Sequence, residues 1–346
     1  MRIGLLSVLL ALVACTPAAP AAPTAAPTPP PTALEHVRYA TTTGSATSAP
    51  VYIAQARGYF QQQGIDLELV PFGGGAQMIS SIAGSQVDVA NTDSGAGLIN
   101  AMGRNLPMRF AADGARCAEG RCNSALTVRK ELVDSGAFKD LSDLRGLNVN
   151  TFTPGSTLNM FSYRTLEKAG LKPTDIKEQT FNDFGDILPA FVSKSLDATY
   201  LIEPFTTQGV AQGVLVKFKD TSQILGPQQS TLIVYAPTFA TQRQEVGKKF
   251  MVAYLRGVRD FLDAFDSGKD QDQIISILTS ATLLKDPAQW KSVPQTFDPN
   301  GAILLDTLKF NQQWYVEHGA IQSPVDLDAV WDPTYTDYAI SVLGKR

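Results

Sequence analysis

Short segments with two different hydrophobic periods follow one another along most of the chain. Some are apolar throughout or alternate with period two, which is typical of β-strands. Others have the period of a helix, such as residues 76–83, or carry helix signals, such as residues 48–58 with a serine and a proline at the start and a glycine at the end. Strands that alternate with helices predict an α/β fold with mostly parallel sheets. The first strand-like segments are residues 37–40, 65–70, 87–90 and 107–112.

A second unit with the same pattern follows. Residues 147–150 and 198–201 have strand patterns, and residues 156–169 have a helical pattern. A shift of 109 residues aligns the two units without a gap, so that Phe72 falls on Phe181 and Asp88 on Asp197. The alignment has few identities and chance similarity stays an alternative, but a true repeat would mean two lobes built on one plan.

The remainder of the chain is mainly helical in pattern. Residues 239–265 have the spacing of an amphipathic helix. Three further segments, residues 270–282, 302–318 and 333–343, also have helical patterns. No run of 18 apolar residues follows residue 14, so no membrane span is expected in the mature chain.

The N-terminus has the pattern of an export signal. Met1 and Arg2 precede twelve uncharged residues, 3–14, which are too few to span a bilayer but are typical of a secretory signal peptide. Leu12 to Cys15 resembles a bacterial lipobox, in which the cysteine becomes the lipidated first residue; a chance cysteine after an ordinary signal is the alternative. Residues 16–33 contain only Pro, Ala and Thr and predict an extended tether.

Composition narrows the possible chemistry. A formal net charge of −4 provides no basic excess for nucleic acid. The two histidines, His36 and His318, are far apart, and three cysteines cannot form a zinc cluster, so neither a metal nor a cofactor is expected. Cys117 and Cys122 would lie in an oxidising compartment, where a disulfide is expected and free thiols are the alternative.

Several segments together resemble one protein family. They are APVYIAQ at residues 49–55, GYF at 58–60, GIDLELV at 64–70, IAGSQVDVA at 82–90, LRGL at 144–147 and EPF at 203–205. They resemble the NMT1/THI5-like family of solute-binding proteins of ABC importers, and its riboflavin-binding type is the favoured subclass. The resemblance implies a type II periplasmic-binding-protein clamshell, in which each lobe is a mostly parallel sheet flanked by helices.

The resemblance also implies a division of the chain. Residues 1–14 would be the signal peptide, and 15–34 the lipidated cysteine with its Pro/Ala/Thr-rich tether. Residues 35–124 and 236–346 would form the first lobe, and residues 125–235 the second. Crossover strands near 124–128 and 231–235 would act as the hinge.

Ligands of open parallel sheets bind at the carboxyl ends of the strands, which selects six loops. These loops are rich in Gly, Ser and Thr, contain no Lys or Arg, and carry Asp93, Asp183 and Glu203. Such acceptors and nearby aromatic rings suit a flat ligand with N–H or O–H donors, although Arg116 and Arg121 in the cysteine loop could oppose this. The predicted ligand-binding residues are Ser45, Thr47, Tyr52, Phe72, Gly74, Thr92, Asp93, Ser94, Gly155, Ser156, Thr157, Asn182, Glu203 and Phe205.

Structural roles are the alternatives for these residues. Any single Ser or Thr can be a helix cap or turn residue, Glu203 can cap its own lobe, and each aromatic ring can be core. No catalytic residue is predicted, because the pyrimidine synthase of the family is tied to a cysteine-rich motif and a histidine that this chain lacks.

The first functional hypothesis is therefore a monomeric binding lipoprotein, not an enzyme. Acylated at Cys15, for example with palmitate, it would face outward from the cell membrane and deliver its ligand to the transmembrane subunits of an ABC permease. Riboflavin is the favoured ligand and a thiamine pyrimidine is next, with alkanesulfonate, taurine or nitrate as alternatives within the family. A sensory module that presents its bound state to a membrane receptor is a further possibility.

Overall fold

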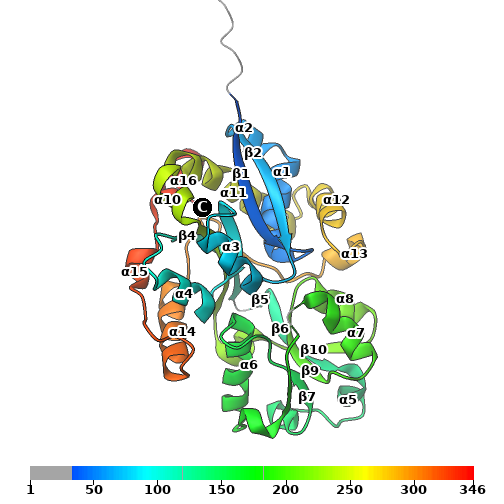
Figure 1. The fold of residues 1–346 in the computed structure, drawn as a ribbon. Helices are drawn as coiled ribbons and strands as arrows, with labels where there is room; N and C mark the ends of the chain where they lie inside the picture. The colour runs from blue at the N-terminus through cyan, green and yellow to red at the C-terminus, as the bar shows by residue number, and fades with distance from the viewer. Residues whose placement is uncertain (1–32, 119, 182) are drawn as a thin grey trace, which may run out of the picture. The chain divides into compact units, whose positions relative to one another are not determined.

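Two β-sheets flanked by helices make up the fold in the computed structural model, which describes residues 33–118, 120–181 and 183–346 (Figure 1). The first sheet has the strand order β2-β1-β3-β11-β4-β5 and the second has the order β10-β6-β9-β7-β8. The predicted α/β class with two lobes is confirmed. We call each sheet, with the elements packed on it, the first or the second lobe.

The first sheet combines a parallel part with an antiparallel part. β1 pairs in parallel with both β2 and β3, whereas β11 is antiparallel to β3 and β4. Alternating apolar residues such as Ile65, Leu67 and Leu69 explain why β2 forms where the period-two pattern predicted it. Its strands are β1 (Glu35–Thr42), β2 (Ile65–Phe72), β3 (Val89–Asp93), β4 (Arg109–Ala118), β5 (Arg121–Cys122) and β11 (Gln228–Tyr235).

The second sheet follows the same plan. β7 pairs in parallel with β8 and β9, and β6 is antiparallel to β9 and β10. The sequence pattern did not reveal the short edge strand β8 or the strand β10. The strands are β6 (Ser124–Arg129), β7 (Asn148–Asn150), β8 (Lys177–Gln179), β9 (Ala198–Ile202) and β10 (Leu215–Asp220).

Two aspartates occupy equivalent places in the two sheets. Asp88 precedes β3, and its carboxylate accepts the backbone N–H of Arg38 at 2.8 Å. Asp197 precedes β9, and its carboxylate accepts the backbone N–H of Asn148 at 2.9 Å. The shared strand order and these matched contacts support the interpretation of the 109-residue shift as a repeat.

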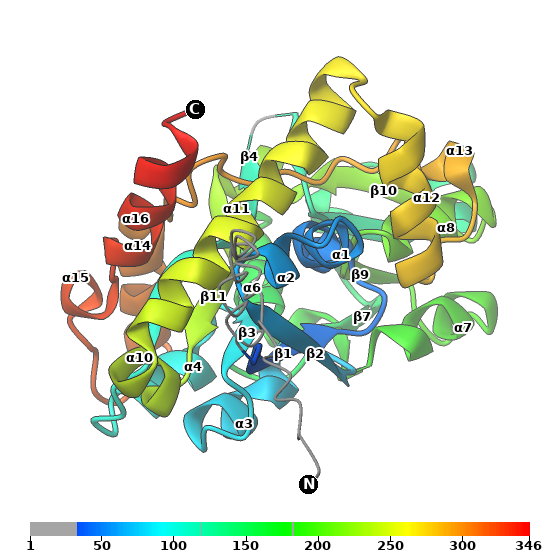
Figure 2. The same cartoon turned by 90° about the horizontal axis from the view of Figure 1, so that it is seen from above.

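Helices cover both sheets. Figure 2 shows the long helix α11 crossing over the first sheet, with α1 and α12 beside it. The helices are α1 (Ala49–Ala56), α2 (Tyr59–Gln62), α3 (Ile79–Ala83), α4 (Ala96–Met102), α5 (Lys130–Asp134), α6 (Thr157–Lys168), α7 (Ile187–Val192), α8 (Phe205–Ala211), α9 (Thr221–Leu225), α10 (Pro237–Gln242), α11 (Gln244–Ser267), α12 (Gln271–Ala281), α13 (Pro287–Trp290), α14 (Leu305–Glu317), α15 (Leu327–Val330) and α16 (Thr334–Leu343). Short 3₁₀ turns are η1 (Ala46–Ser48), η2 (Gly75–Met78), η3 (Leu141–Leu144), η4 (Pro173–Asp175) and η5 (Phe184–Asp186). Among the described residues, no helix has the length and apolar character needed to cross a membrane.

Helix α14 contacts the second lobe, although residues 236–346 were expected to belong to the first. Trp314 and Tyr315 pack into the apolar core of the second lobe. The indole N–H of Trp314 donates to Glu167 on α6 at 3.3 Å, and Figure 1 shows the two helices side by side. The predicted division of the chain into lobes stays a prediction, and α14 belongs to both sides of it.

The chain crosses between the sheets at two short segments. The first crossing is at Asn123, between β5 and β6, directly before the segment 124–128 that was expected to be a crossover and that forms most of β6. The return crossing comes at residues 226–227, before the expected segment, because residues 231–235 already pair with β3 and β4 in the first sheet. Just before the first crossing, Cys117 on β4 and Cys122 on β5 are paired neighbours and form a disulfide.

Candidate functional site

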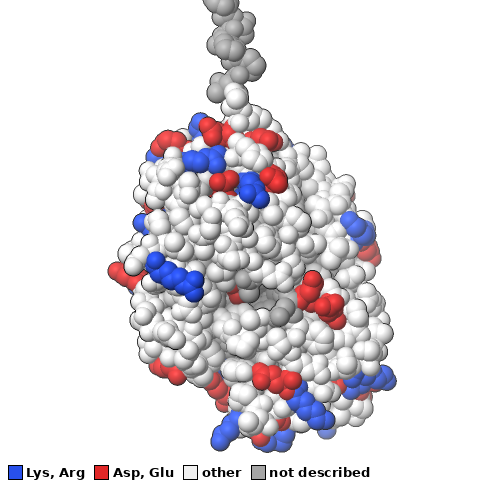
Figure 3. Space-filling view, in the orientation of Figure 1, with Lys and Arg blue, Asp and Glu red and all other residues white. Residues whose placement is uncertain are grey.

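A cavity of about 300 Å³ lies between the two lobes at the carboxyl ends of their parallel strands. We call it the central cavity. Figure 3 shows a hollow here, with acidic side chains at its edge and basic side chains set back from it. The residues that line it are Gly74, Gly75, Gln77, Asp93, Phe152, Thr153, Ser156, Leu158 and Phe184.

The first lobe contributes a glycine loop that follows β2. Gly75 lies so close to β3 that a Cβ on it would come within 2.8 Å of the backbone nitrogen of Asp93. The hydroxyl of Thr92 donates to the carbonyl of Gly75 at 2.7 Å and fixes this approach. Glycine at this position therefore brings the backbone of the loop to the floor of the cavity.

Asp93, at the end of β3, reaches across to the second lobe. Its Oδ2 accepts the backbone N–H of Thr157, at the start of α6, at 3.2 Å. Burial raises the pKa of Asp93 to about 6, against the N–H groups of Thr157 and Gly95, which lower it. The carboxylate of Asp93 therefore occupies the N-terminus of α6, where a bound anion would otherwise be attracted.

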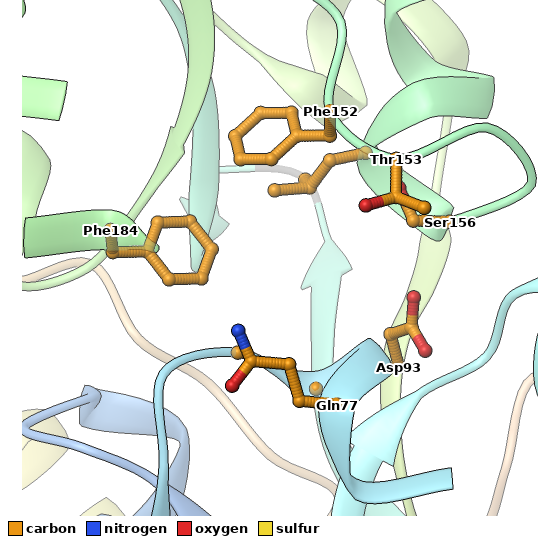
Figure 4. A pocket seen from close by; sticks show the side chains of 9 residues that line it. Gln77, Asp93, Phe152, Thr153, Ser156 and Phe184 are labelled. Carbon is orange, nitrogen blue, oxygen red and sulfur yellow. The ribbon is translucent and has the colours of Figure 1, made fainter. Parts of the chain in front are cut away.

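The second lobe contributes two phenyl rings. Phe152 has a φ of +62°, which is rare for a bulky residue. The side-chain oxygen of Asn150 accepts its N–H at 3.0 Å and that of Phe181 at 2.9 Å, so one asparagine positions both loops. Figure 4 shows the rings of Phe152 and Phe184 directed into the cavity from one side and Gln77 and Asp93 from the other.

Phe184 rests on a second ring outside the cavity. Its ring stacks on that of Phe205 with centroids 5.4 Å apart and an angle of 19° between the planes. It also contacts the ring of Phe152 at 5.7 Å. These contacts give the cavity one firm aromatic wall.

A second cavity, the outer cavity, adjoins the first and measures about 450 Å³. It shares Gln77, Asp93 and Ser156 with the central cavity and reaches outward to Arg104. Among the described residues, no Lys or Arg lines the central cavity.

The two arginines of the cysteine loop lie elsewhere. Arg116 pairs with Asp113 and Asp298, and Arg121 with Asp266, so neither opposes the acceptors of the cleft. The described residues also contain no group of three His, Cys, Asp or Glu side chains that could hold a metal.

A third cavity, the inner chamber, has a volume of about 50 Å³ and lies deeper between the lobes. It shares Gly75, Asp93 and Phe184 with the central cavity. Its other walls come from loops and crossover strands of both lobes: Thr42, Thr47, Asn123, Thr157, Leu158, Ile202, Ser230 and Thr231.

Few direct hydrogen bonds join the lobes around these cavities. The N–H of Ala96 donates to the carbonyl of Gly155 at 2.7 Å, and the N–H of Ala46 donates to that of Glu203 at 3.1 Å. The hydroxyls of Ser94 and Thr157 lie 3.3 Å apart. Contacts of this kind can break and reform as units when two lobes move about a hinge.

The structure brings together about half of the predicted binding residues. Gly74, Asp93, Ser156, Gly155, Thr47 and Thr157 line the three cavities. Asn182 and the lipidation residue Cys15 lie outside the described residues. The predicted residues that line none of the three cavities are Ser45, Tyr52, Phe72, Thr92, Ser94, Glu203 and Phe205.

Most of these other residues have supporting roles. Ser45 caps η1, and Ser94 donates to the carbonyl of Gln229 at 3.1 Å. Phe72 packs at the edge of the first core, whereas Tyr52 lines a separate surface groove between α1 and α12. The carboxylate of Glu203 accepts the N–H of Thr207 at 3.1 Å, which favours the capping role weighed for it.

Residues missed by sequence reasoning come from positions next to the predicted loops. Phe152 directly precedes one loop and Phe184 follows another, so a wider window around each strand end could have found them. Gln77 lies one turn into η2. Thr231 was treated as the first residue of a hinge strand, and Asn123 and Ser230 directly precede the two expected hinge segments. The available signal was a polar residue next to each apolar hinge segment.

Two buried carboxyls predict a pH-dependent stability. Burial raises the pKa of Glu203 to about 7 from 4.5 and that of Asp93 to about 6 from 3.8. The folded chain then holds protons that the unfolded chain releases, so the free energy of unfolding should fall as pH rises from about 4 to 8. Urea denaturation at pH 5 and pH 8 measures this. The free energy of unfolding of Glu203→Gln, relative to that of the native chain, should be about 1–3 kcal/mol higher at pH 8 than at pH 5. If the free energy of unfolding of both Glu203→Gln and Asp93→Asn fell with pH as steeply as that of the native chain, this prediction would be contradicted.

Comparison with known proteins gives sequence relatives. A family model described as "NMT1/THI5 like" matches residues 45–264. "Putative binding protein YtlA" of Bacillus subtilis (strain 168) is 24% identical over 226 residues, which is 64% of this chain and 64% of that protein. A "Putative aliphatic sulfonates-binding protein" of Escherichia coli (strain K12) is 24% identical over 210 residues, 59% of this chain and 62% of that protein. The match therefore spans less than two thirds of the length of either relative.

A solved structure supports the fold. The periplasmic nitrate-binding protein NrtA from Synechocystis PCC 6803 superposes with a TM-score of 0.75 at 14% identity, over 90% of this chain and 89% of that one. These three proteins are named as binding proteins, which agrees with the prediction that the chain is not an enzyme.

Proposed function

The chain belongs to the NMT1/THI5-like family, and from this premise we propose that it is an extracytoplasmic solute-binding lipoprotein of an ABC importer. It captures a small compound in the cleft between its lobes and delivers it to the permease. The proposal needs no bond to break in the ligand. Binding stabilises the closed arrangement because the ligand contacts both lobes at once.

The observation that carries this proposal is the central cavity. Its walls come from both lobes, with Gly74, Gln77 and Asp93 on one side and Phe152 and Phe184 on the other. A volume of about 300 Å³ lies at the lower end of the range for small-molecule sites. A one-ring or two-ring compound is the size that such a cavity encloses.

The lining favours a flat ligand with hydrogen-bond donors. The rings of Phe152 and Phe184 offer a stacking surface, and Gln77 and Asp93 offer acceptors opposite them. We therefore propose a heteroaromatic vitamin or vitamin precursor. A thiamine pyrimidine has the size that the central cavity encloses, whereas riboflavin, with three rings and a ribityl chain, would also have to extend into the outer cavity.

A sulfonate or nitrate is the second candidate, because relatives of this chain are named for those anions. Two features of the site oppose it. No cation lines the central cavity among the described residues, and the carboxylate of Asp93 already accepts the N–H of Thr157 at the start of α6. An anion would have to displace that carboxylate or lie beside it.

The N-terminal assignments complete the proposal. Cleavage after residue 14 would leave Cys15 as the acylated first residue, and residues 16–33 would tether the folded part to the outer face of the cell membrane. A tethered binding protein stays near its permease and acts as a monomer. The mass of the N-terminal peptide of the mature chain decides this assignment.

Calorimetry on the purified chain tests the ligand class. We expect heat of binding with a hydroxymethylpyrimidine or riboflavin and much weaker binding of taurine and nitrate, because the lining offers acceptors and rings. Phe184→Ala should weaken binding about tenfold by removing the stacking wall. Phe310→Ala is the matched control, because Phe310 is exposed on α14 and lines none of the three cavities.

Two outcomes of this titration would count against the proposal. Tight binding of taurine or nitrate with none of the ring compounds would replace the heteroaromatic ligand by an anion. No heat and no thermal shift with any of the four compounds would overturn the binding function as proposed.

A further inference from the structure

Helix α14 carries a buried tyrosine at the junction of the two lobes. Tyr315 is fully buried, and it belongs to an apolar core that includes Ile99 on α4 of the first lobe and Phe161 on α6 of the second. Figure 1 shows α14 alongside both of these helices. Tyr315 therefore lies where α4, α6 and α14 meet, directly behind the loop that leads into α6.

The hydroxyl of Tyr315 contacts this loop at a residue of the site. It donates to the carbonyl of Ser156 at 3.2 Å. Ser156 caps the N-terminus of α6 and lines both the central and the outer cavity. Burial raises the pKa of Tyr315 well above its usual value, and the charge of Asp93 raises it further. The hydroxyl therefore keeps its proton at neutral pH and stays a donor to the loop.

Residues 153–157, which we call the binding loop, also have hydrogen bonds within the second lobe. The N–H of Ser156 donates to the carbonyl of Thr153 at 3.0 Å. The N–H of Gly155 donates to the side-chain oxygen of Asn159 at 3.1 Å. Both of these bonds join residues less than five positions apart, so they shape the loop but do not tie it to another element.

The first lobe holds the binding loop only while the lobes are close together. The N–H of Ala96 donates to the carbonyl of Gly155 at 2.7 Å, and Oδ2 of Asp93 accepts the N–H of Thr157 at 3.2 Å. Ala96 and Asp93 belong to the first lobe, so both contacts are lost when the lobes separate. The contact from α14 does not depend on closure if that helix stays with the second lobe.

α14 is fixed to the second lobe by its own contacts with α6. The indole N–H of Trp314 donates to the carboxylate of Glu167 at 3.3 Å. The ring of His318, directly after the helix, stacks on that of Trp314 with centroids 3.8 Å apart, and its Nε2 lies 3.0 Å from the same carboxylate. The amide of Asn100 on α4 contacts the carbonyl of Ala320, in the turn that follows the helix. α14 should therefore move with α6 when the cleft opens.

We propose that Tyr315 is a positioning residue for ligand binding, whose hydroxyl holds the binding loop in its bound geometry before the ligand arrives. This rests on the proposed solute-binding function and adds to it a residue that touches no ligand, since Tyr315 lines none of the three cavities. A loop that is ordered in advance loses less conformational entropy when the ligand binds, so the affinity is higher.

Tyr315→Phe tests this role because it removes only the hydroxyl. The carbonyl of Ser156 also accepts the N–H of Met160 at 3.1 Å, so the substitution does not leave it without a partner. Hydrogen exchange is measured on the free chain by mass spectrometry of a peptide that covers the binding loop. We expect exchange in Tyr315→Phe to be faster than in the native chain by a factor of about three or more.

Tyr235→Phe is the matched control. Tyr235 is also fully buried, and its hydroxyl donates to the carbonyl of Gly247 at 2.7 Å within the first lobe. Both variants lose a buried hydroxyl that donates to a carbonyl, so their thermal midpoints should fall by similar amounts. Exchange in the binding loop should stay native in Tyr235→Phe. Native exchange of this loop in Tyr315→Phe would overturn the proposal, since a purely structural tyrosine predicts that result.

Calorimetry with a hydroxymethylpyrimidine, riboflavin, taurine and nitrate in turn measures the effect on affinity. The compounds that bind the native chain should bind Tyr315→Phe about fivefold more weakly and Tyr235→Phe with native affinity. Native affinity in Tyr315→Phe would overturn the positioning role and leave the binding function standing. No binding of any of the four compounds to the native chain would overturn the proposed function, and the role of Tyr315 in binding with it.

Discussion

Replacing Arg116 by alanine is expected to lower the free energy of unfolding by about 3–5 kcal/mol. The side chain of Asp113 is fully buried, and Nε of Arg116 lies 3.3 Å from its Oδ2. The same guanidinium contacts Asp298 and donates to the carbonyl of Ala302, which ties β4 to the segment before α14. Without Arg116 the buried carboxylate of Asp113 keeps its desolvation cost but loses its counter-charge.

The effect should depend on pH in a defined direction. Burial raises the pKa of Asp113, and the charge of Arg116 opposes that rise. In Arg116→Ala the pKa of Asp113 should therefore rise further, so the carboxyl takes up a proton more easily as pH falls. The loss of stability should be larger at pH 8 than at pH 5.

Urea denaturation at these two pH values measures both effects. Arg104→Ala is the matched control, because Arg104 is exposed and, among the arginines that the structure describes, it alone has a side chain with no ion pair, hydrogen bond or ring contact. Its substitution should change the free energy of unfolding by about 0.5 kcal/mol or less. Equal midpoints for the two variants would mean that the Arg116 contacts contribute nothing to stability.

Most strands in the parallel part of each sheet were predictable because their residues alternate or are mostly apolar. β2 shows the period of two, and β9 is buried at every position. β8 was missed because its three residues are all polar, and β10 was missed although Val216 to Lys219 alternate between apolar and polar over four residues. They form because neighbouring strands offer hydrogen-bond partners, which a single sequence does not reveal.

The site was predictable only as a set of loops. The rule that ligands lie at the carboxyl ends of parallel strands identified the loops that hold Gly74, Asp93 and Ser156. It did not identify which side chain of each loop faces the cavity. Phe152 faces it because of its positive φ, which depends on the hydrogen bond that Asn150 accepts from it.

The antiparallel strand β11 shows a different limit of the sequence. The run at residues 231–235 is mostly apolar and was interpreted as a crossover, but Thr231 lies opposite Asp93 and lines the inner chamber. This juxtaposition joins residues 138 positions apart, a pairing set by sheet register. Thr231 is the last of four polar residues that precede the apolar half of β11, and this polar run was the trace of the pairing in the sequence.

Replacing Gly95 by alanine is expected to weaken ligand binding by about tenfold or more while leaving the fold intact. A Cβ on Gly95 would lie 2.6 Å from the carbonyl oxygen of Gly155 in the opposite lobe. The φ of Gly95 is −77°, so alanine fits the local backbone. The clash with Gly155 exists only when the lobes approach each other, whereas a milder contact of 3.1 Å with Oδ2 of Asp93 lies within the first lobe. Overpacking of this kind costs about 1–3 kcal/mol, and here most of that cost falls on the closed arrangement, because the shortest contact is the one between the lobes.

Gly103→Ala is the matched control at the other end of α4. Its φ is −60°, and a Cβ there would meet nothing closer than 3.5 Å, so binding should stay at the native level. Calorimetry with the ligand that the native chain binds measures the affinities, and small-angle scattering should show Gly95→Ala to be the more open variant with ligand present. Native affinity in Gly95→Ala would show that the two lobes need not close on the ligand, and the hinge mechanism would fail. A loss of affinity with unchanged thermal stability is the expected result. It would mean that ligand binding depends on the contact between the lobes, whereas folding of the free chain does not.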